Sequence, residues 1–156
     1  MNDLTNSQKK AIQDLFPEEG THCFGCGRNN PKGLHIKTYC KGEECICTFQ
    51  PQDHHLAYPE VGCGGIISTV LDCHSINSAM YAAYKSENRE VGSKPDMIYA
   101  TASMTINFLK PAPMHDEWVF TAKIIKISER RITVECKVVG NGVEFANGNV
   151  VAAKIK

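Results

Sequence analysis

The sequence predicts an α+β fold in which an antiparallel β-sheet wraps around one long central helix. Apolar residues recur at three- and four-residue steps from Ile66 to Tyr84 and cover much of the helix, so this helix must be enclosed on most sides. From Tyr99 almost to the C-terminus the apolar period changes to two, which is typical of strands. A chain of 156 residues with 42% apolar content is long enough to build one such core.

After the helix we expect strands over residues 99–109, 117–127, 131–139 and 143–155. Asn141-Gly142 is a strong signal for a hairpin turn between the last two. In the first of them, apolar and small polar residues alternate. The apolar side carries Ala102, Met104, Ile106 and Phe108, and the polar side carries Thr101, Ser103, Thr105 and Asn107. Such a polar face suits either an exposed sheet surface or the seam of a dimer.

Before the long helix we expect a short helix over residues 7–16 and two strands over 34–40 and 44–49, joined by a turn at Lys41-Gly42-Glu43. In the second of these strands, Cys45, Cys47 and Phe49 share one face. We assign residues 1–22 to an N-terminal helix and lead-in, and residues 23–156 to a single domain.

The charge balance excludes several classes of function. The chain has 17 basic and 17 acidic residues, whereas proteins that coat nucleic acid or anionic membranes need a basic excess. We find no export signal and no apolar stretch long enough to span a bilayer, so we expect a cytoplasmic protein with no membrane partner. In that reducing compartment most of the eight cysteines should be free thiols.

The start of the long helix is the first candidate site. The unpaired amides of a helix N-terminus attract negative charge, and glycines such as Gly64 and Gly65 leave room for another group to approach that backbone closely. Asp72 is an acidic residue on an otherwise apolar helix, where burial would make it a better base or nucleophile. The alternatives are tight packing of the glycines against a strand, and an aspartate that caps a neighbouring loop.

Cysteine and histidine residues near the helix allow several interpretations. Cys63 is either a reactive thiol before a helix N-terminus or a small apolar filler. His55 either binds substrate or belongs to a solvated loop. Cys23 and Cys26 form one CxxC pair, which can be a structural turn, half of a zinc site, or a redox pair. We favour the structural turn and expect no metal.

Three segments, in this order, resemble the hotdog-fold thioesterases, and most closely the branch related to phenylacetate-pathway thioesterases. The first is Cys23-Phe24-Gly25-Cys26-Gly27 with Asn30-Pro31-Lys32-Gly33-Leu34. The second is the run from Gly64-Gly65 to Asp72, and the third is the segment 101–108 with Leu109-Lys110-Pro111-Ala112-Pro113. His55 followed by Tyr58-Pro59 matches a further recurring pattern.

The resemblance implies hydrolysis of an acyl-CoA thioester to free acid and CoA, with no cofactor. The Gly64 amide would polarise the thioester carbonyl, and Asp72 would act as nucleophile or general base. Substrate contacts would come from His55, Cys63, Gly65, Lys110 and Arg130, the last two as partners of the CoA phosphates. The fold implies a homodimer or homotetramer with the active site shared between subunits.

Cys63 stands where this family usually has a histidine. That departure motivates an alternative function, a non-catalytic protein that binds acyl-CoA or another small ligand on the same scaffold. A metal or redox module built on the N-terminal cysteines is a second alternative. A hydratase of the same fold fits less well, because its histidine and carboxylate pair cannot be mapped onto this sequence.

Overall fold

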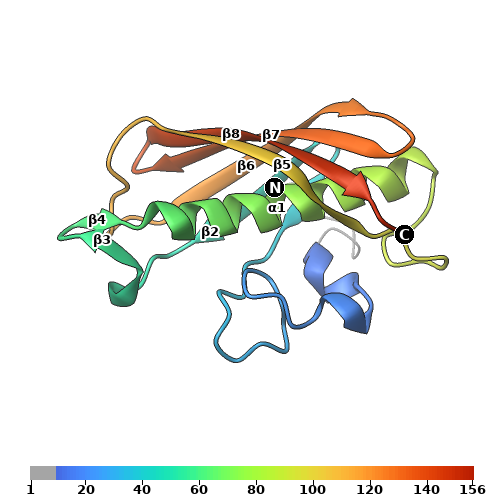
Figure 1. Cartoon of the computed structure of the whole chain (residues 1–156), viewed down its shortest axis with the longest axis horizontal. Helices are drawn as coiled ribbons and strands as arrows, with labels where there is room; N and C mark the ends of the chain where they lie inside the picture. Colours follow the sequence, from blue (N-terminus) through green and yellow to red (C-terminus); the bar gives the residue numbers. More distant parts are fainter. Residues whose placement is uncertain (1–9) are drawn as a thin grey trace, which may run out of the picture.

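The computed structural model of the chain describes residues 10–156 and places one long helix across a six-stranded antiparallel sheet (Figure 1). The helix is α1 (Gly64–Ser86), and the strand order of the sheet is β1-β2-β6-β7-β8-β5. These strands are β1 (Tyr39–Lys41), β2 (Glu44–Phe49), β5 (Tyr99–Phe108), β6 (Trp118–Ile127), β7 (Arg131–Gly140) and β8 (Val143–Lys154). The predicted hotdog arrangement is therefore confirmed.

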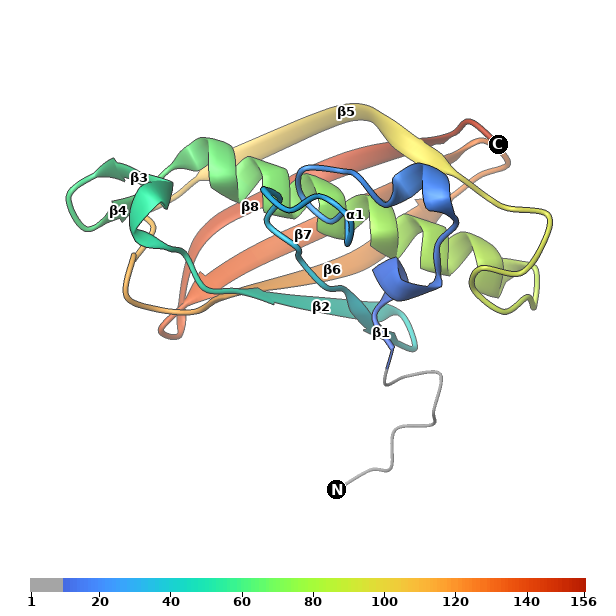
Figure 2. The same cartoon turned by 90° about the horizontal axis from the view of Figure 1, so that it is seen from below.

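Shorter elements complete the fold. The 3₁₀-helices η2 (Ile12–Leu15) and η3 (Glu18–Gly20) lie in the N-terminal segment, and η4 (Asp53–His55) precedes a small ribbon of β3 (Leu56–Tyr58) and β4 (Val61–Gly62). The N-terminal segment passes over the side of α1 that faces away from the sheet, so the helix lies between the two (Figure 2). None of the helices in residues 10–156 has the length and apolar character needed to cross a membrane.

Alternating burial along the strands explains why they form this sheet. In β7, Ile132, Val134, Cys136 and Val138 are buried while the residues between them are not. The predicted turn at Asn141-Gly142 is present, with φ of 48° and 74° at the two residues. Trp118, the first residue of β6, is fully buried in the core, and its indole Nε1–H donates to the carbonyl of Pro113 at 2.8 Å.

In the edge strand β5, the side of the sheet that Thr101 faces differs from the prediction. Simple alternation places Thr101 on one face of the strand and Met104 and Phe108 on the other. However, the register of β5 against β8 changes between Thr101 and Ser103. Thr101, Met104 and Phe108 pair with Ala152, Val150 and Ala146, which are all buried. The irregularity therefore turns Thr101 to the helix side, because one extra residue reverses the alternation beyond it.

The helix predicted over residues 7–16 and the strand predicted over residues 34–40 are both shorter in the structure than predicted. Of the helix predicted over residues 7–16, residues 7–9 lie outside the described part, and the remainder forms only the short η2. The Ile12 N–H donates to the Thr38 carbonyl at 2.9 Å, so this backbone pairs with another segment instead of continuing a helix. The strand predicted over 34–40 begins only at Tyr39, since the Ile36 N–H donates to the Gly25 carbonyl and the Leu34 N–H to the Phe24 carbonyl.

Six of the eight cysteines are free thiols, as expected for most of them. Cys40 and Cys45 are the exception, because a disulfide joins them across the β1–β2 hairpin, where they are direct partners in the register. The bridge closes this hairpin beside the C-terminal half of α1.

Candidate functional site

The N-terminus of α1 offers unpaired amides. Cys63 is the N-cap residue with an extended backbone, and its side chain does not cap the helix. Within the described residues, the N–H groups of Gly64 and Gly65 donate to no carbonyl or side chain, while the Cys63 carbonyl accepts from Ile66 and Ile67. Two adjacent donors at the positive end of a helix dipole suit a developing oxyanion.

The glycines at this end are required to different degrees. A Cβ on Gly64 would meet the ring of Phe108 on β5 at 3.3 Å, which is a tight contact. A Cβ on Gly65 would meet only the Cys63 sulfur at 3.6 Å, and Gly65 is exposed. Gly64 therefore faces the edge strand, whereas Gly65 faces open space.

His55 supports the loop that leads into α1. Its carbonyl accepts the Cys63 N–H at 2.8 Å, and its imidazole Nδ1 accepts the Gln52 N–H at 3.0 Å. The ring is only 5% exposed and packs on Phe49 with 5.4 Å between ring centroids. Burial, with a smaller effect of His54, lowers the pKa of His55 and favours the neutral acceptor. The ring of His55 is therefore buried and hydrogen-bonded, so the interpretation of His55 as part of a solvated loop is wrong.

Asp72 projects from the middle of α1 toward the same edge strand. It is half-buried, and the Thr101 hydroxyl donates to its Oδ1 at 2.5 Å. Burial raises the pKa of the Asp72 carboxyl, and the hydrogen bond from Thr101 opposes that rise. Sequence reasoning did not identify Thr101 as a partner of Asp72, because this contact depends on the register change in β5.

Gly64 and Asp72 face β5 together but lie apart along the helix. They are eight residues apart, which corresponds to about 12 Å of helix axis at about 1.5 Å per residue. One thioester carbonyl therefore cannot touch both groups of the same chain. The geometry requires either one of them to act alone or a second chain to supply the other.

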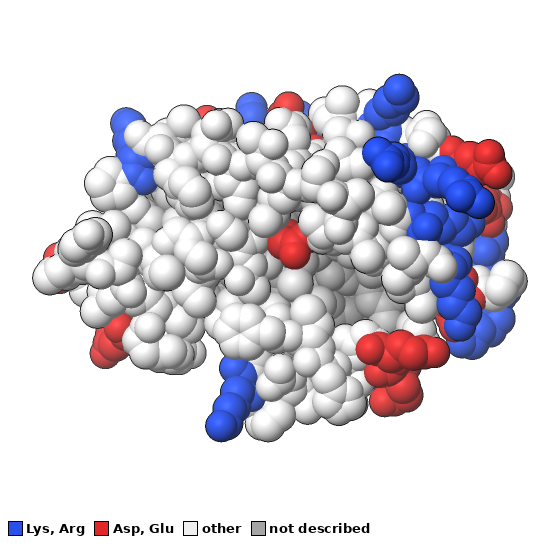
Figure 3. All heavy atoms as spheres, viewed as in Figure 1, with Lys and Arg blue, Asp and Glu red and all other residues white. Residues whose placement is uncertain are grey.

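The two basic residues predicted to bind phosphate lie at opposite ends of the sheet. The Lys110 N–H donates to the Phe145 carbonyl, and the Arg130 carbonyl accepts from the Lys154 N–H. Phe145 and Lys154 are nine residues apart on β8, about 30 Å at about 3.4 Å per residue. Within one chain they do not form a common phosphate site. On the face shown in Figure 3, Lys and Arg gather at the end where Figure 1 places the C-terminus.

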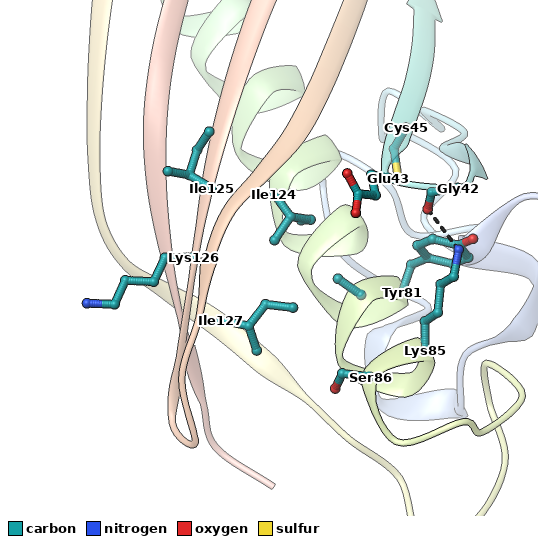
Figure 4. A pocket seen from close by; sticks show the side chains of 11 residues that line it. Gly42, Glu43, Cys45, Tyr81, Lys85, Ser86, Ile124, Ile125, Lys126 and Ile127 are labelled. Atoms are coloured by element: carbon teal, nitrogen blue, oxygen red, sulfur yellow. Dashed lines mark hydrogen bonds between the residues drawn. The ribbon is translucent and has the colours of Figure 1, made fainter.

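A cavity of about 500 Å³ lies elsewhere, between the C-terminal half of α1 and the neighbouring strands. Tyr81 and Lys85 of α1 and Ile124 and Ile127 of β6 line it, and the Lys85 Nζ donates to the Gly42 carbonyl at 3.1 Å (Figure 4). None of the site residues predicted from sequence lines this cavity.

Comparisons with known proteins agree with this fold. The model of the thioesterase superfamily matches residues 73–143, a segment that begins directly after Asp72. A thioesterase superfamily protein from Shewanella loihica PV-4 is 30% identical, and the match covers 78% of this chain and 91% of that one with a TM-score of 0.64. The chain belongs to the thioesterase superfamily.

Two more distant structures share the fold. The PaaI protein from the phenylacetic acid degradation operon of E. coli has 14% identity, a TM-score of 0.65, and coverage of 79% of this chain and 81% of that chain. The smu.793 protein from Streptococcus mutans UA159, bound to acetyl CoA, has 17% identity, a TM-score of 0.62, and coverage of 76% and 87%. No curated protein matches the chain significantly.

Proposed function

We propose that this protein hydrolyses an acyl-CoA thioester at a site shared between two copies of the chain. The observation that carries the proposal is that both candidate groups face one uncovered edge strand, Gly64 at Phe108 and Asp72 at Thr101. The Gly64 amide would hold the oxyanion, and Asp72 would attack the thioester carbon or activate water. A structure of this fold bound to acetyl CoA supports the substrate class.

A second copy paired along β5 satisfies the geometry. An edge strand of ten residues with exposed Met104, Phe108 and, just beyond it, Leu109 needs a cover. Antiparallel pairing of two β5 strands reverses one helix relative to the other, which moves Asp72 of one copy toward Gly64 of the other. The same operation moves the Arg130 end of one copy toward the Lys110 end of the other.

The first experiment measures hydrolysis of short, medium, long and aromatic acyl-CoAs by the wild type and by Asp72→Asn. Loss of the thioester is followed by chromatography, because six free thiols would also react with a thiol reagent. We expect Asp72→Asn to lower kcat by about 100-fold or more, and the exposed Asp14→Asn to behave as wild type. If the wild type turns over no thioester but acyl-CoA raises its Tm, the chain is a binding protein instead.

Subunit mixing tests the shared site directly. Asp72→Asn and Gly64→Val should each be inactive, with the folding of both checked by circular dichroism. A shared site predicts that an equimolar mixture regains about a quarter of wild-type activity, because half of the dimers are mixed and each has one intact site. A mixture that stays inactive although mixed dimers form would contradict the shared arrangement.

A further inference from the structure

Three cysteine sulfurs that are distant in sequence meet on the outer side of α1. Cys23 and Cys26 come from the N-terminal segment, and Cys73 comes from the middle of the helix. All three Sγ atoms lie within 4.8 Å of one another, and Cys23 Sγ and Cys73 Sγ are 3.6 Å apart. Figure 2 shows this segment lying against the middle of α1. The sequence analysis did not identify the third member, because Cys73 lies 47 positions after Cys26 in the chain.

The spacing of the sulfurs fits a metal-thiolate site. Two thiolates bound to one tetrahedral Zn²⁺ at about 2.3 Å lie ~3.8 Å apart. The observed distance of 3.6 Å between Cys23 Sγ and Cys73 Sγ is close to this sulfur–sulfur distance. A disulfide requires about 2.05 Å between sulfurs. Binding Zn²⁺ therefore needs only small shifts of these side chains.

The backbone of the loop is shaped so that the sulfurs can converge. A Cβ on Gly25 would lie 2.4 Å from the Cys73 sulfur, so a side chain there would push the loop away from α1. A Cβ on Gly27 would lie 2.4 Å from the Cys23 nitrogen, inside the turn closed by the Gly27 N–H and the Cys23 carbonyl at 2.8 Å. Both glycines of the Cys-Phe-Gly-Cys-Gly run are therefore required by this arrangement.

Polar contacts hold the sulfurs in place. Cys23 Sγ and Cys73 Sγ lie within hydrogen-bonding distance of each other at 3.6 Å. The Asn77 amide donates to the Cys26 sulfur at 3.7 Å and to the Cys73 carbonyl at 2.6 Å. These partners orient the sulfurs and stabilise negative charge on them.

We propose that Cys23, Cys26 and Cys73 bind one thiophilic divalent cation, Zn²⁺, which joins the N-terminal loop to α1. Each Zn–S bond forms as the sulfur gives up its proton, where it still has one, to solvent. Among residues 10–156 no fourth His, Cys, Asp or Glu joins this group, so water completes the tetrahedron. The metal fastens the N-terminal loop to the helix that carries Asp72.

The test uses the full-length chain, reduced with a phosphine and freed of metal by chelation. Zn²⁺ affinity is measured by competition with a chromophoric chelator, and Co²⁺ is added separately to detect thiolate-to-cobalt absorption. We expect one metal ion per chain, a rise in Tm, and a fall in affinity of about 100-fold or more in Cys23→Ser, Cys26→Ser and Cys73→Ser. Cys63→Ser, a half-buried free thiol outside the cluster, is the matched control and should bind as wild type.

Thiol protection keeps the test decisive if a serine variant fails to fold. Zn²⁺ should slow alkylation of Cys23, Cys26 and Cys73 in the wild type, as located by mass spectrometry, and leave Cys63 reactive. Equal Zn²⁺ binding by the wild type and a Cys23→Ser/Cys73→Ser double variant would overturn the proposal. So would a stoichiometric Cys23–Cys26 or Cys23–Cys73 disulfide that persists in the reduced preparation and excludes metal.

Discussion

We predict that the protein loses a measurable part of its folding stability in mild acid because of the buried imidazole of His74. Its side chain is completely buried on α1, and the groups that bond to it are neutral. The Gln13 amide donates to the Thr38 hydroxyl at 3.1 Å, and that hydroxyl donates to His74 Nδ1 at 2.9 Å. His74 Nε2–H then donates to the Cys45 carbonyl at 3.2 Å. A proton on Nδ1 would leave the Thr38 hydroxyl hydrogen without its acceptor.

The magnitude follows from the pKa of His74, which burial lowers from 6.5 to about 4. Because the folded pKa lies below the unfolded one, the unfolded chain binds more protons in this interval. The folded state therefore has its full stability above pH ~6.5 and loses about 1.4 kcal/mol per pH unit below it. Over the whole interval the loss is about 3 kcal/mol.

Urea unfolding followed by fluorescence of Trp118, the only tryptophan, measures this loss at constant ionic strength between pH 7.5 and 5. His74→Gln should be less stable at neutral pH but should have a pH slope smaller by about 1.4 kcal/mol per unit. The exposed His22→Gln should keep the wild-type slope. Parallel pH profiles for His74→Gln and the wild type would refute the assignment.

Three further substitutions test the packing, each by urea unfolding. Gly62→Ala should destabilise by about 1–3 kcal/mol, because its Cβ would lie 2.5 Å from the Trp118 ring; Gly20→Ala, with open space around it, is the control. Thr38→Val should destabilise by about 1–3 kcal/mol, since it leaves two buried groups unpaired; an unchanged midpoint would contradict the network. Gly65→Ala should raise the free energy of unfolding by up to about 1 kcal/mol, because alanine favours the helix and its Cβ would meet only the Cys63 sulfur at 3.6 Å; a loss of stability would show that the position is not open.

The regular elements could be predicted because their signals are local. Apolar spacing located α1 and the strands β6, β7 and β8 to within a residue or two, since each buries one continuous face against the others. The N-terminal segment could not be predicted in this way. Its backbone groups pair with Thr38 and with the Gly25 turn rather than with near neighbours, so composition alone does not reveal its conformation.

The same distinction between local signals and long-range contacts applies to the candidate site. The sequence alone placed Asp72 on an apolar helix, because a residue's place on its own helix follows from chain spacing, and the family resemblance placed Gly64-Gly65 at the start of that helix. The tertiary structure alone placed Thr101 beside Asp72 and Cys73 beside the CxxC loop, and it put Lys110 and Arg130 at opposite ends of the sheet. Those contacts depend on strand register and on the path of a loop, which are set by packing between distant segments.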